Sequence, residues 1–599
     1  MPRRAALLLL LAGCAAPHPA PTRPAAAKAT SSAAALAASA PASVTPPASV
    51  ANARPSEAVA PHVRRRFAGG GPGSVSGRAG LVTSSEPQAT RAGVAMLEQG
   101  GNAVDAAVAT AFALAVTHPS AGNIGGGGFL LVRSAEAGAV TFALDFRETA
   151  PAALTREGFD KMQRGGAKGG AAAGVPGSVA GLLLALERFG TLPREQVLAP
   201  AVALAKNGFV LGRRQADLLA GSYAELKKDK TLAKRLGGDA GPKASGSRIT
   251  MPELAASLER IQKDGAAGFY SGPTAQALAR APGSLIRPND LASYRPIERS
   301  VLSFEYRGLT VETMPPPSAG GVALAEILGM LQALNAHEAH GAEELHLFLE
   351  ASRRAQADRR FSVRDPDAAA PSANEDSMRR FISGPLLLDR APIDRDHATP
   401  SKKLAPLFPG AVPESEQTTH LSVVDAQGMV VSLTTTLSAS FGAKITAPGT
   451  GIVLNNTVAS FSSTGENQPA PGRRTTSSMA PTLVLDAGQV ALVLGTPGGD
   501  TIPSTIAQVL RNVVDHGFPL DQAVAAPRIH QGFLPDRARF ESRRPLDPSL
   551  LKALKALGHD IRGSHIAMGD SNDILLEDEL AYAVADPRGG GLAAAAKSP

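Results

Sequence analysis

Apolar residues recur at helical spacing through much of the chain before residue 366. Such stretches repeat an apolar side chain every three or four positions, which is typical of helices with one buried face. The stretch over 103–116 is apolar nearly all round and follows Asn102, which can cap a helix, so it predicts a buried core helix. The pattern predicts helices over 87–100, 103–116, 179–189, 200–206, 254–264, 273–281, 320–334 and 342–360.

Runs of β-branched and aliphatic residues predict strands, most densely after residue 417. They lie at 129–132, 140–146, 418–424, 430–436, 451–454, 482–485 and 490–495, and helices follow at 504–516, 520–525 and 550–557. In the strand 418–424, Thr419, Leu421 and Val423 alternate onto one face. The glycines at 125–128 stand between a helix and a strand, the reverse of a phosphate-binding loop. They therefore predict backbone packed tightly against a site, where side chains would not fit.

The composition is that of a soluble globular protein, with 44% hydrophobic and 19% charged residues in 599. A chain of this length exceeds one ordinary core unless the fold is a large layered α/β unit. The net charge is +7, but the 60 basic and 53 acidic residues are interspersed. We therefore expect no nucleic-acid partner.

The N-terminus predicts export and a lipid anchor. Residues 1–13 have a short positive segment followed by an apolar run, and they end in Leu-Ala-Gly before Cys14, as bacterial lipoprotein signals do. Cys14, the only cysteine, would carry the lipid, which places the protein at the cell envelope on the periplasmic side. A plain secretory signal is the alternative. Residues 14–75 are rich in Ala, Pro and Ser, which predicts a disordered tether.

Two clusters of charged or histidine residues, at 350–358 and 337–340, are interpreted as structural and not as binding sites. Glu350, Arg354 and Asp358 recur at intervals of four residues, which predicts a salt-linked helix face. The segment 337–340 carries two histidines but lacks the spacing that places two imidazoles on one helical face. With no zinc, P-loop or dinucleotide signature, we expect neither a metal nor a cofactor.

Thr418 combines two chemical groups if the chain is cut directly before it. It would then carry a hydroxyl and a free α-amine, whose pKa lies near ~8, so that a neutral fraction can accept the hydroxyl proton. This is the threonine form of an activated N-terminal nucleophile. An isolated Thr-Thr-His in a strand is otherwise unremarkable.

Several blocks in order resemble one family. They are Gly100–Ala107, Asp145–Pro151, Thr418–Asp425, Thr434–Leu437, Gly451–Asn456, Ser477–Thr482 and Gly495–Gly499. The chain resembles the γ-glutamyltransferase family of N-terminal-nucleophile hydrolases from about Ser76 onwards. The resemblance implies a four-layer αββα sandwich. It also implies a precursor cut between Gln417 and Thr418 into a large subunit, 76–417, and a small subunit, 418–599, which form a heterodimer.

The resemblance also implies roles for individual residues. Thr418 would be the nucleophile, the hydroxyl of Thr436 would bond to it, and the N–H groups of Gly498 and Gly499 would form an oxyanion hole. Arg147, Ser477 and Ser478 would hold the substrate α-carboxylate, and Thr457 lies in a substrate-binding segment. The substrate would be a γ-glutamyl amide such as glutathione, and water or an amine would accept the acyl group.

The chain departs from the family where the substrate α-ammonium would bind. Ser460 stands at a position that is usually acidic and Ser438 at one that is usually Asn. Neither supplies a countercharge, and charge-assisted bonds contribute ~1.5–3 kcal/mol. The segment 461–476 is also short, which predicts an open site. Three functions remain: a γ-glutamyltransferase or hydrolase, an acylase for glutaryl-type amides that lack the amine, and an inactive surface-anchored binding protein.

Overall fold

The computed structural model describes residues 65–166, 168–238, 241–361, 363, 365–368, 382–404, 418–463, 467–578 and 580–597. The predicted signal, Cys14, most of the predicted tether and Gln417 lie outside these residues. None of the helices in these ranges has both the length and the hydropathy of a transmembrane segment.

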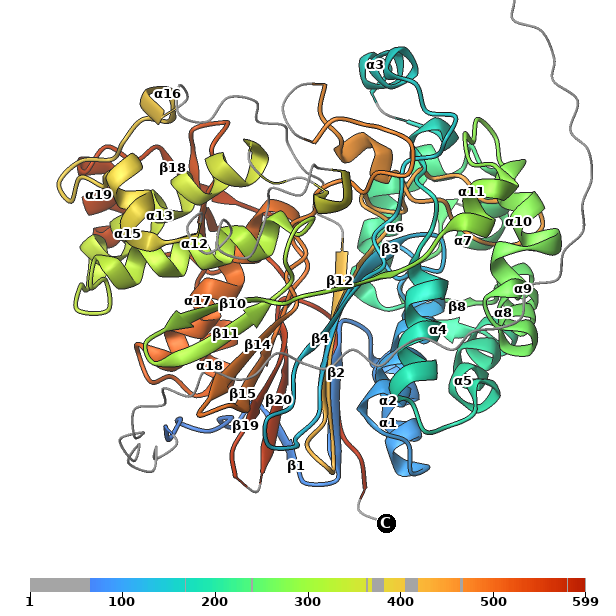
Figure 1. Cartoon of the computed structure of the whole chain (residues 1–599), viewed down its shortest axis with the longest axis horizontal. Coiled ribbons are helices and arrows are strands. Elements are labelled where there is room, and N and C mark those ends of the chain that lie inside the picture. Colours follow the sequence, from blue (N-terminus) through green and yellow to red (C-terminus); the bar gives the residue numbers. More distant parts are fainter. Residues whose placement is uncertain are drawn as a thin grey trace, which may run out of the picture. The chain divides into compact units, whose positions relative to one another are not determined.

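Two antiparallel sheets of seven strands each lie face to face at the centre of the body, residues 62–599 (Figure 1). The first sheet has the order β21 (Leu592–Ala595), β2 (Gly80–Ser84), β12 (Thr418–Asp425), β13 (Val430–Thr436), β3 (Gly127–Arg133), β4 (Phe142–Asp145) and β9 (Ile297–Arg299). The second has the order β1 (Val75–Gly77), β20 (Ala581–Ala585), β19 (Asn572–Leu576), β15 (Gln489–Leu494), β14 (Thr482–Asp486), β11 (Leu309–Thr313) and β10 (Leu302–Tyr306).

Helices cover the outer face of each sheet. The first sheet packs against α1 (Pro87–Glu98) and α2 (Ala103–Thr117). Around these two lie α4 (Ser178–Phe189), α5 (Arg194–Asn207) and α8 (Pro252–Asp264), with α6 (Arg213–Leu226), α7 (Lys230–Leu236), α9 (Ala267–Tyr270), α10 (Gly272–Ala279) and α11 (Pro288–Ser293) also on this side of the body. The second packs against α12 (Ala319–Ala333), α13 (Gly341–Phe361), α15 (Gly384–Arg390), α17 (Ile502–Val514), α18 (Leu520–Ala525) and α19 (Pro548–Ala556). The predicted αββα sandwich is confirmed (Figure 1).

Smaller elements complete the body. They are α3 (Arg156–Arg164), α16 (Ser401–Leu404), a sheet of β16 (Ile529–Gln531), β17 (Ala538–Glu541) and β18 (Ile561–Ser564), and the pairs β5 (Phe209–Val210) with β8 (Arg248–Ile249) and β6 (Gly237–Gly238) with β7 (Gly241–Pro242).

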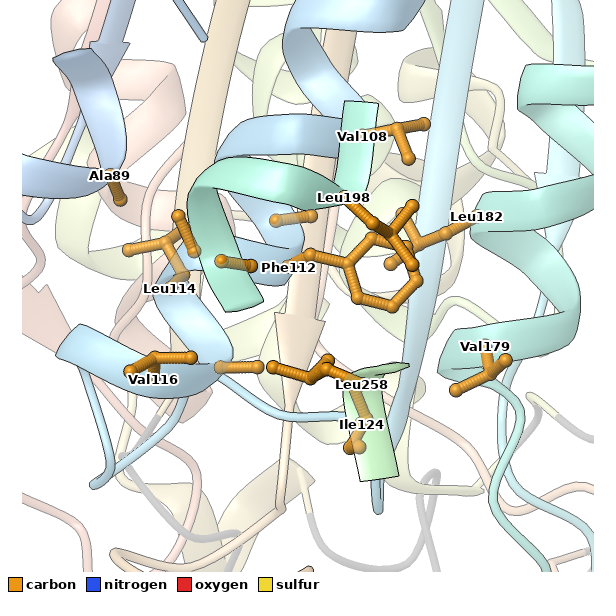
Figure 2. Packing of buried hydrophobic residues seen from close by; sticks show 14 of the residues in the cluster. Ala89, Val108, Phe112, Leu114, Val116, Ile124, Val179, Leu182, Leu198 and Leu258 are labelled. Atoms are coloured by element: carbon orange, nitrogen blue, oxygen red, sulfur yellow. The ribbon is translucent and has the colours of Figure 1, made fainter. Parts of the chain in front are cut away.

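The helix α2 forms the centre of the core under the first sheet, as its all-round apolar sequence predicted. Every residue of α2 is buried, and Asn102 and Asp105 close its N-terminus with a reciprocal capping box. Figure 2 shows Phe112 of α2 directed toward Leu198 of α5 and Leu182 of α4. Burying one such side chain stabilises the fold by about 1.5–3 kcal/mol.

The stretch 451–454 is not a strand, so that prediction was wrong. Its backbone bonds locally to the residues just before it, with the Ala447 N–H donating to Ile452 O at 2.9 Å and the Leu454 N–H to Ile445 O at 2.9 Å. Gly451 has a φ of +72°. The apolar residues therefore close a compact loop over the helices instead of joining a sheet.

The predicted salt-linked face on α13 is buried. Arg354 pairs with Glu350 at 2.8 Å, as the spacing predicted. Asp358 pairs with Arg390 of α15. One pair therefore lies within α13 and the other joins α13 to α15, and the charges on α13 do not form an exposed surface.

The first described residues contact the body. The Leu520 N–H donates to Gly69 O and the Asp521 N–H to Gly70 O, each at 3.0 Å. This part of the predicted tether therefore packs against α18.

Candidate active site

Strands β12 and β13 bring two threonines together. Their register places Thr418, the first residue of β12, directly opposite Thr436, the last residue of β13. The two Oγ1 atoms lie 3.4 Å apart, the distance of a long hydrogen bond, and both side chains are buried. The structure thus unites the two threonines that the resemblance singles out.

The face of β12 that carries Thr418 points toward the second sheet. His420 lies on this face, with Nδ1 2.8 Å from Thr434 Oγ1 and Nε2 3.1 Å from Ser422 Oγ. A Cβ on Gly495 of the facing sheet would come within 2.1 Å of its ring. Burial lowers the pKa of His420 to about 3, so the imidazole is neutral. The sequence prediction gave His420 no role, although its spacing of two from Thr418 placed it on the same face.

The glycines at 125–128, the last two of which begin β3, pack tightly against β13, as predicted. A Cβ on Gly126 would come 2.0 Å from Thr436 O, and a Cβ on Gly128 would come 2.3 Å from Thr434 O. Asn123 Oδ1 accepts the Gly126 N–H at 2.8 Å. Larger residues here would therefore displace the backbone that carries Thr436.

Gly498 and Gly499 form a turn directly before α17. Their φ angles are +136° and +59°, in the region that favours glycine. A Cβ on Gly498 would come 2.5 Å from Thr501 Oγ1. The turn leads through a short 3₁₀ segment, Gly499–Thr501, into the N-terminus of α17. Backbone N–H groups at this end of a helix carry partial positive charge and favour an anion.

Arg147 follows β4 and is buried. Its backbone N–H donates to Asp145 Oδ1 at 2.8 Å. Its Nη1 pairs with Glu148 Oε2 at 3.0 Å, while Nε and Nη2 make only long contacts to Thr475 O and Thr476 O, at 3.5 and 3.4 Å. Two of the guanidinium nitrogens therefore have weak partners that a substrate carboxylate can replace.

Glu148 is a site residue that the sequence prediction missed. Its Oε1 accepts the Thr457 hydroxyl at 2.8 Å, and a Cβ on Gly127 would come 2.7 Å from its Oε2. Burial raises the pKa of Glu148, although Arg147 and Thr457 act in the opposite direction. The one feature of the sequence that could have identified Glu148 is its position directly after Arg147. The predicted residue Thr457 thus lies behind Glu148.

Ser438 and Ser460, the two departures from the family pattern, contact each other. Their Oγ atoms lie 3.3 Å apart. Ser438 has a φ of +76°, and its N–H donates to Thr436 Oγ1 at 2.8 Å. The backbone of Ser438 therefore orients the second threonine while its side chain faces Ser460.

One pocket of about 230 Å³ collects most of the predicted residues. It is lined by Arg147, Thr418, Thr436, Ser438, Ser477 and Gly499, together with Met479 and Ile502. Gly498 and Ser478 adjoin two of these in the chain, and Ser460 reaches the pocket through Ser438. Ser478 is buried, and its carbonyl packs against Gly320 of α12.

The short segment 461–476 is held close to the pocket. Asn467 Nδ2 donates to Ser460 O at 2.8 Å, and its Oδ1 accepts the Thr476 N–H at 3.3 Å. Residues 464–466 lie outside the described ranges, so the open site stays a prediction. No group of three or more His, Cys, Asp or Glu among the described residues could hold a metal ion.

An αββα sandwich with Thr418 at the start of a central strand defines the class of N-terminal-nucleophile hydrolases. A sequence model of the Gamma-glutamyltranspeptidase family matches residues 89–596, and the chain belongs to this family. The protein is therefore an amidohydrolase of this class.

Similar proteins include both glutathione hydrolases and acylases. The chain is 38% identical over 540 residues to the glutathione hydrolase proenzyme of Escherichia coli (strain K12), covering 86% of this chain and 91% of that protein. It is 34% identical over 525 residues to the acylase ACY 1 proenzyme of Pseudomonas sp. (strain V22), covering 83% and 90%. The crystal structure of cephalosporin acylase from Bacillus halodurans superposes with a TM-score of 0.78 at 26% identity, covering 91% and 100%.

Proposed function

We propose that the protein is a self-processing γ-glutamyltransferase and hydrolase that cleaves γ-glutamyl amides such as glutathione. The observation that carries this proposal is the Thr418–Thr436 pair, with Oγ1 atoms 3.4 Å apart, in one pocket with Arg147. The pocket combines a candidate nucleophile with a cation that suits a carboxylate.

Self-processing begins at the peptide bond between Gln417 and Thr418. Thr418 Oγ1 adds to the Gln417 carbonyl carbon, the C–N bond breaks, and the acyl group moves to oxygen as an ester. Water hydrolyses the ester, which leaves a carboxylate on Gln417 and a free amine on Thr418. The two products are the large and small subunits of a heterodimer.

The mature cycle uses the new amine as the base. It takes the Thr418 hydroxyl proton while Oγ1 attacks the substrate amide carbon. The N–H groups of Gly498 and Gly499 stabilise the resulting oxyanion, and each such donor contributes about 10²–10³-fold in rate in other enzymes. The leaving amine takes the proton, and water or an acceptor amine then resolves the acyl-enzyme.

Recognition of the acyl group begins with its α-carboxylate. Arg147 receives it through the nitrogens whose present contacts are long, and Ser477 and Ser478 add neutral hydrogen bonds. Glu148 stays on the opposite side of the guanidinium, at 3.0 Å, and holds its plane. Because the planar fork matches a carboxylate, this contact orients the amide relative to Thr418.

A second candidate is an acylase for glutaryl-type amides, and the Ser438–Ser460 contact favours it. Among the described residues that line the pocket, none is acidic. Both carboxylate oxygens of Glu148, the nearby acid, already have partners in Arg147 and Thr457. An acyl chain without an amine needs no countercharge at Ser438 and Ser460.

The proposal includes a cellular location. Cys14 would carry a lipid after removal of residues 1–13, and the part of the predicted tether before residue 65 would separate the enzyme from the membrane on the periplasmic side. The sequence pattern before Cys14 supports this location.

Two chromogenic anilides, γ-glutamyl and glutaryl, test the substrate on the purified, processed protein. They share the carboxylate and the scissile amide and differ in the α-amine. A higher kcat/KM for γ-glutamyl supports the transferase and hydrolase, and a higher value for glutaryl supports the acylase. Cleavage of neither by a processed protein would exclude both acyl groups.

A further inference from the structure

The turn that carries the two glycines is held from outside by Asp500, the residue that follows them. The Asp500 carboxylate accepts two hydrogen bonds from Arg539 Nη2 of β17, at 3.1 and 3.3 Å. Its Oδ2 lies 3.4 Å from His530 Nε2 of β16. Its backbone carbonyl accepts the Gln356 amide of α13 at 2.8 Å. Three elements distant in sequence thus meet at one residue of the turn.

The same turn is closed from within by Thr501. The Thr501 N–H and hydroxyl both donate to Gly498 O, at 3.1 and 2.9 Å. Gly498 and Gly499 adopt positive φ angles in this turn. Because they have no side chains, their backbones could also adopt many other conformations. The direction of their N–H groups therefore depends on the contacts made by their neighbours.

The negative charge of Asp500 strengthens its contacts with Arg539 and His530. Burial would raise the pKa of Asp500, but His530 and the Arg539 guanidinium outweigh it and keep the pKa below its usual range. Burial also lowers the pKa of His530, so the permanent positive charge facing Asp500 is the Arg539 guanidinium. An ionised carboxylate accepts stronger hydrogen bonds than a neutral group. Asp500 is therefore a charged anchor at neutral pH.

Ser504, His530 and Asp500 have the composition of a catalytic triad, with Ser504 Oγ 2.9 Å from His530 Nδ1. However, Ser504 and His530 are completely buried, and Ser504 lies within α17 with its Oγ also 3.0 Å from Thr501 O. A nucleophile must reach its substrate, and this serine cannot. The network therefore holds the turn and does not attack.

We propose that Asp500, held by His530, Arg539 and Gln356, is a positioning residue that aims the Gly498 and Gly499 N–H groups at the oxyanion formed during amide cleavage. This inference rests on the proposed function, because it assumes an oxyanion at this turn. It predicts that changes at Asp500 weaken binding of the transition state more than binding of the substrate.

The test compares Asp500→Ala and Asp500→Asn with the wild type, using the anilide that the wild type cleaves best. Asp560→Asn is the matched control, since Asp560 also pairs with two arginines, Arg537 and Arg562, but is exposed. Removing one oxyanion donor costs about 10²–10³-fold, so releasing the turn should cost Asp500→Ala about 10–100-fold in kcat. KM should stay within about twofold.

A boronic acid with the same acyl chain provides the second measurement. Its boron accepts the Thr418 oxygen and becomes tetrahedral, so one boron-bound oxygen occupies the oxyanion position. The inhibition constant should rise in parallel with the loss of kcat in Asp500→Ala, and less in Asp500→Asn, which keeps a hydrogen-bond acceptor. If Asp500→Ala does not fold, the near-isosteric Asn variant carries the test.

The outcomes separate the two proposals. Unchanged kcat and boronic acid affinity in both Asp500 variants, or a rise in KM alone, would overturn the positioning role while the proposed function stands. A folded, processed wild type that cleaves neither anilide would overturn the proposed function, and the positioning role with it. Parallel losses in kcat and boronic acid affinity, absent from Asp560→Asn, support the role.

Discussion

The two ends of the pocket are built by different means. At the reaction end, backbone geometry positions the groups: the β12–β13 register aligns Thr418 with Thr436, and the positive φ angles of Gly498 and Gly499 shape the turn. At the end proposed for substrate recognition, which we call the recognition end, side chains form the site: the Arg147 guanidinium, paired with Glu148, and the Ser438–Ser460 contact. Substitutions of side chains at the second end should therefore alter the pocket without moving the backbone at the first.

The largest effect should come from breaking the reaction end at Thr418. Thr418→Ala should remain a single uncut chain and lose activity by at least about 10³-fold, because no other group replaces the nucleophile. Gel electrophoresis and the anilide assay measure the two effects. Thr419→Val is the control, since Thr419 lies on the opposite face and its Oγ1 has no partner among the described residues. Two fragments in Thr418→Ala would contradict the assignment.

Arg147→Lys, at the recognition end, should cause a smaller loss of activity. Lysine keeps the charge beside Glu148 but not the planar fork, so kcat/KM should fall by about 10–100-fold, the value of one charge-assisted bond of about 1.5–3 kcal/mol. Steady-state kinetics with both anilides measure it. Arg188→Lys is the control, because the pair of Arg188 with Glu298 is exposed. A change within twofold at Arg147 would refute carboxylate recognition there.

The smallest effect should come from Ser460→Asp, which should change the substrate preference and not the self-processing. Ser460→Asp would supply a countercharge beside Ser438, so the ratio of γ-glutamyl to glutaryl cleavage should rise about tenfold. The fraction of cut chain should not change, because the reaction end is untouched. Ser463→Asp, at an exposed position nearby, is the control. An unchanged ratio would show that Ser460 does not contact the acyl group.

The sequence by itself determined many of the longer helices, several central strands and the identity of the candidate nucleophile, but it missed most of the short strands, β2 among them. Helix caps, strand alternation and glycine turns depend on a few neighbouring residues, so the buried helix α2 and the strand starting at Thr418 could be read from local patterns. The same locality explains the error at 451–454, where an apolar run closes a loop with the residues before it.

Only the tertiary structure decided the contacts between distant segments. Glu148 meets Thr457, and Asp500 meets both His530 and Gln356, across separations that no local period encodes. The reason is physical: packing of the two sheets and their helices, not chain proximity, determines which polar groups share a buried space. For this protein the candidate nucleophile could thus be recognised in the sequence, whereas the buried polar contacts around it could not.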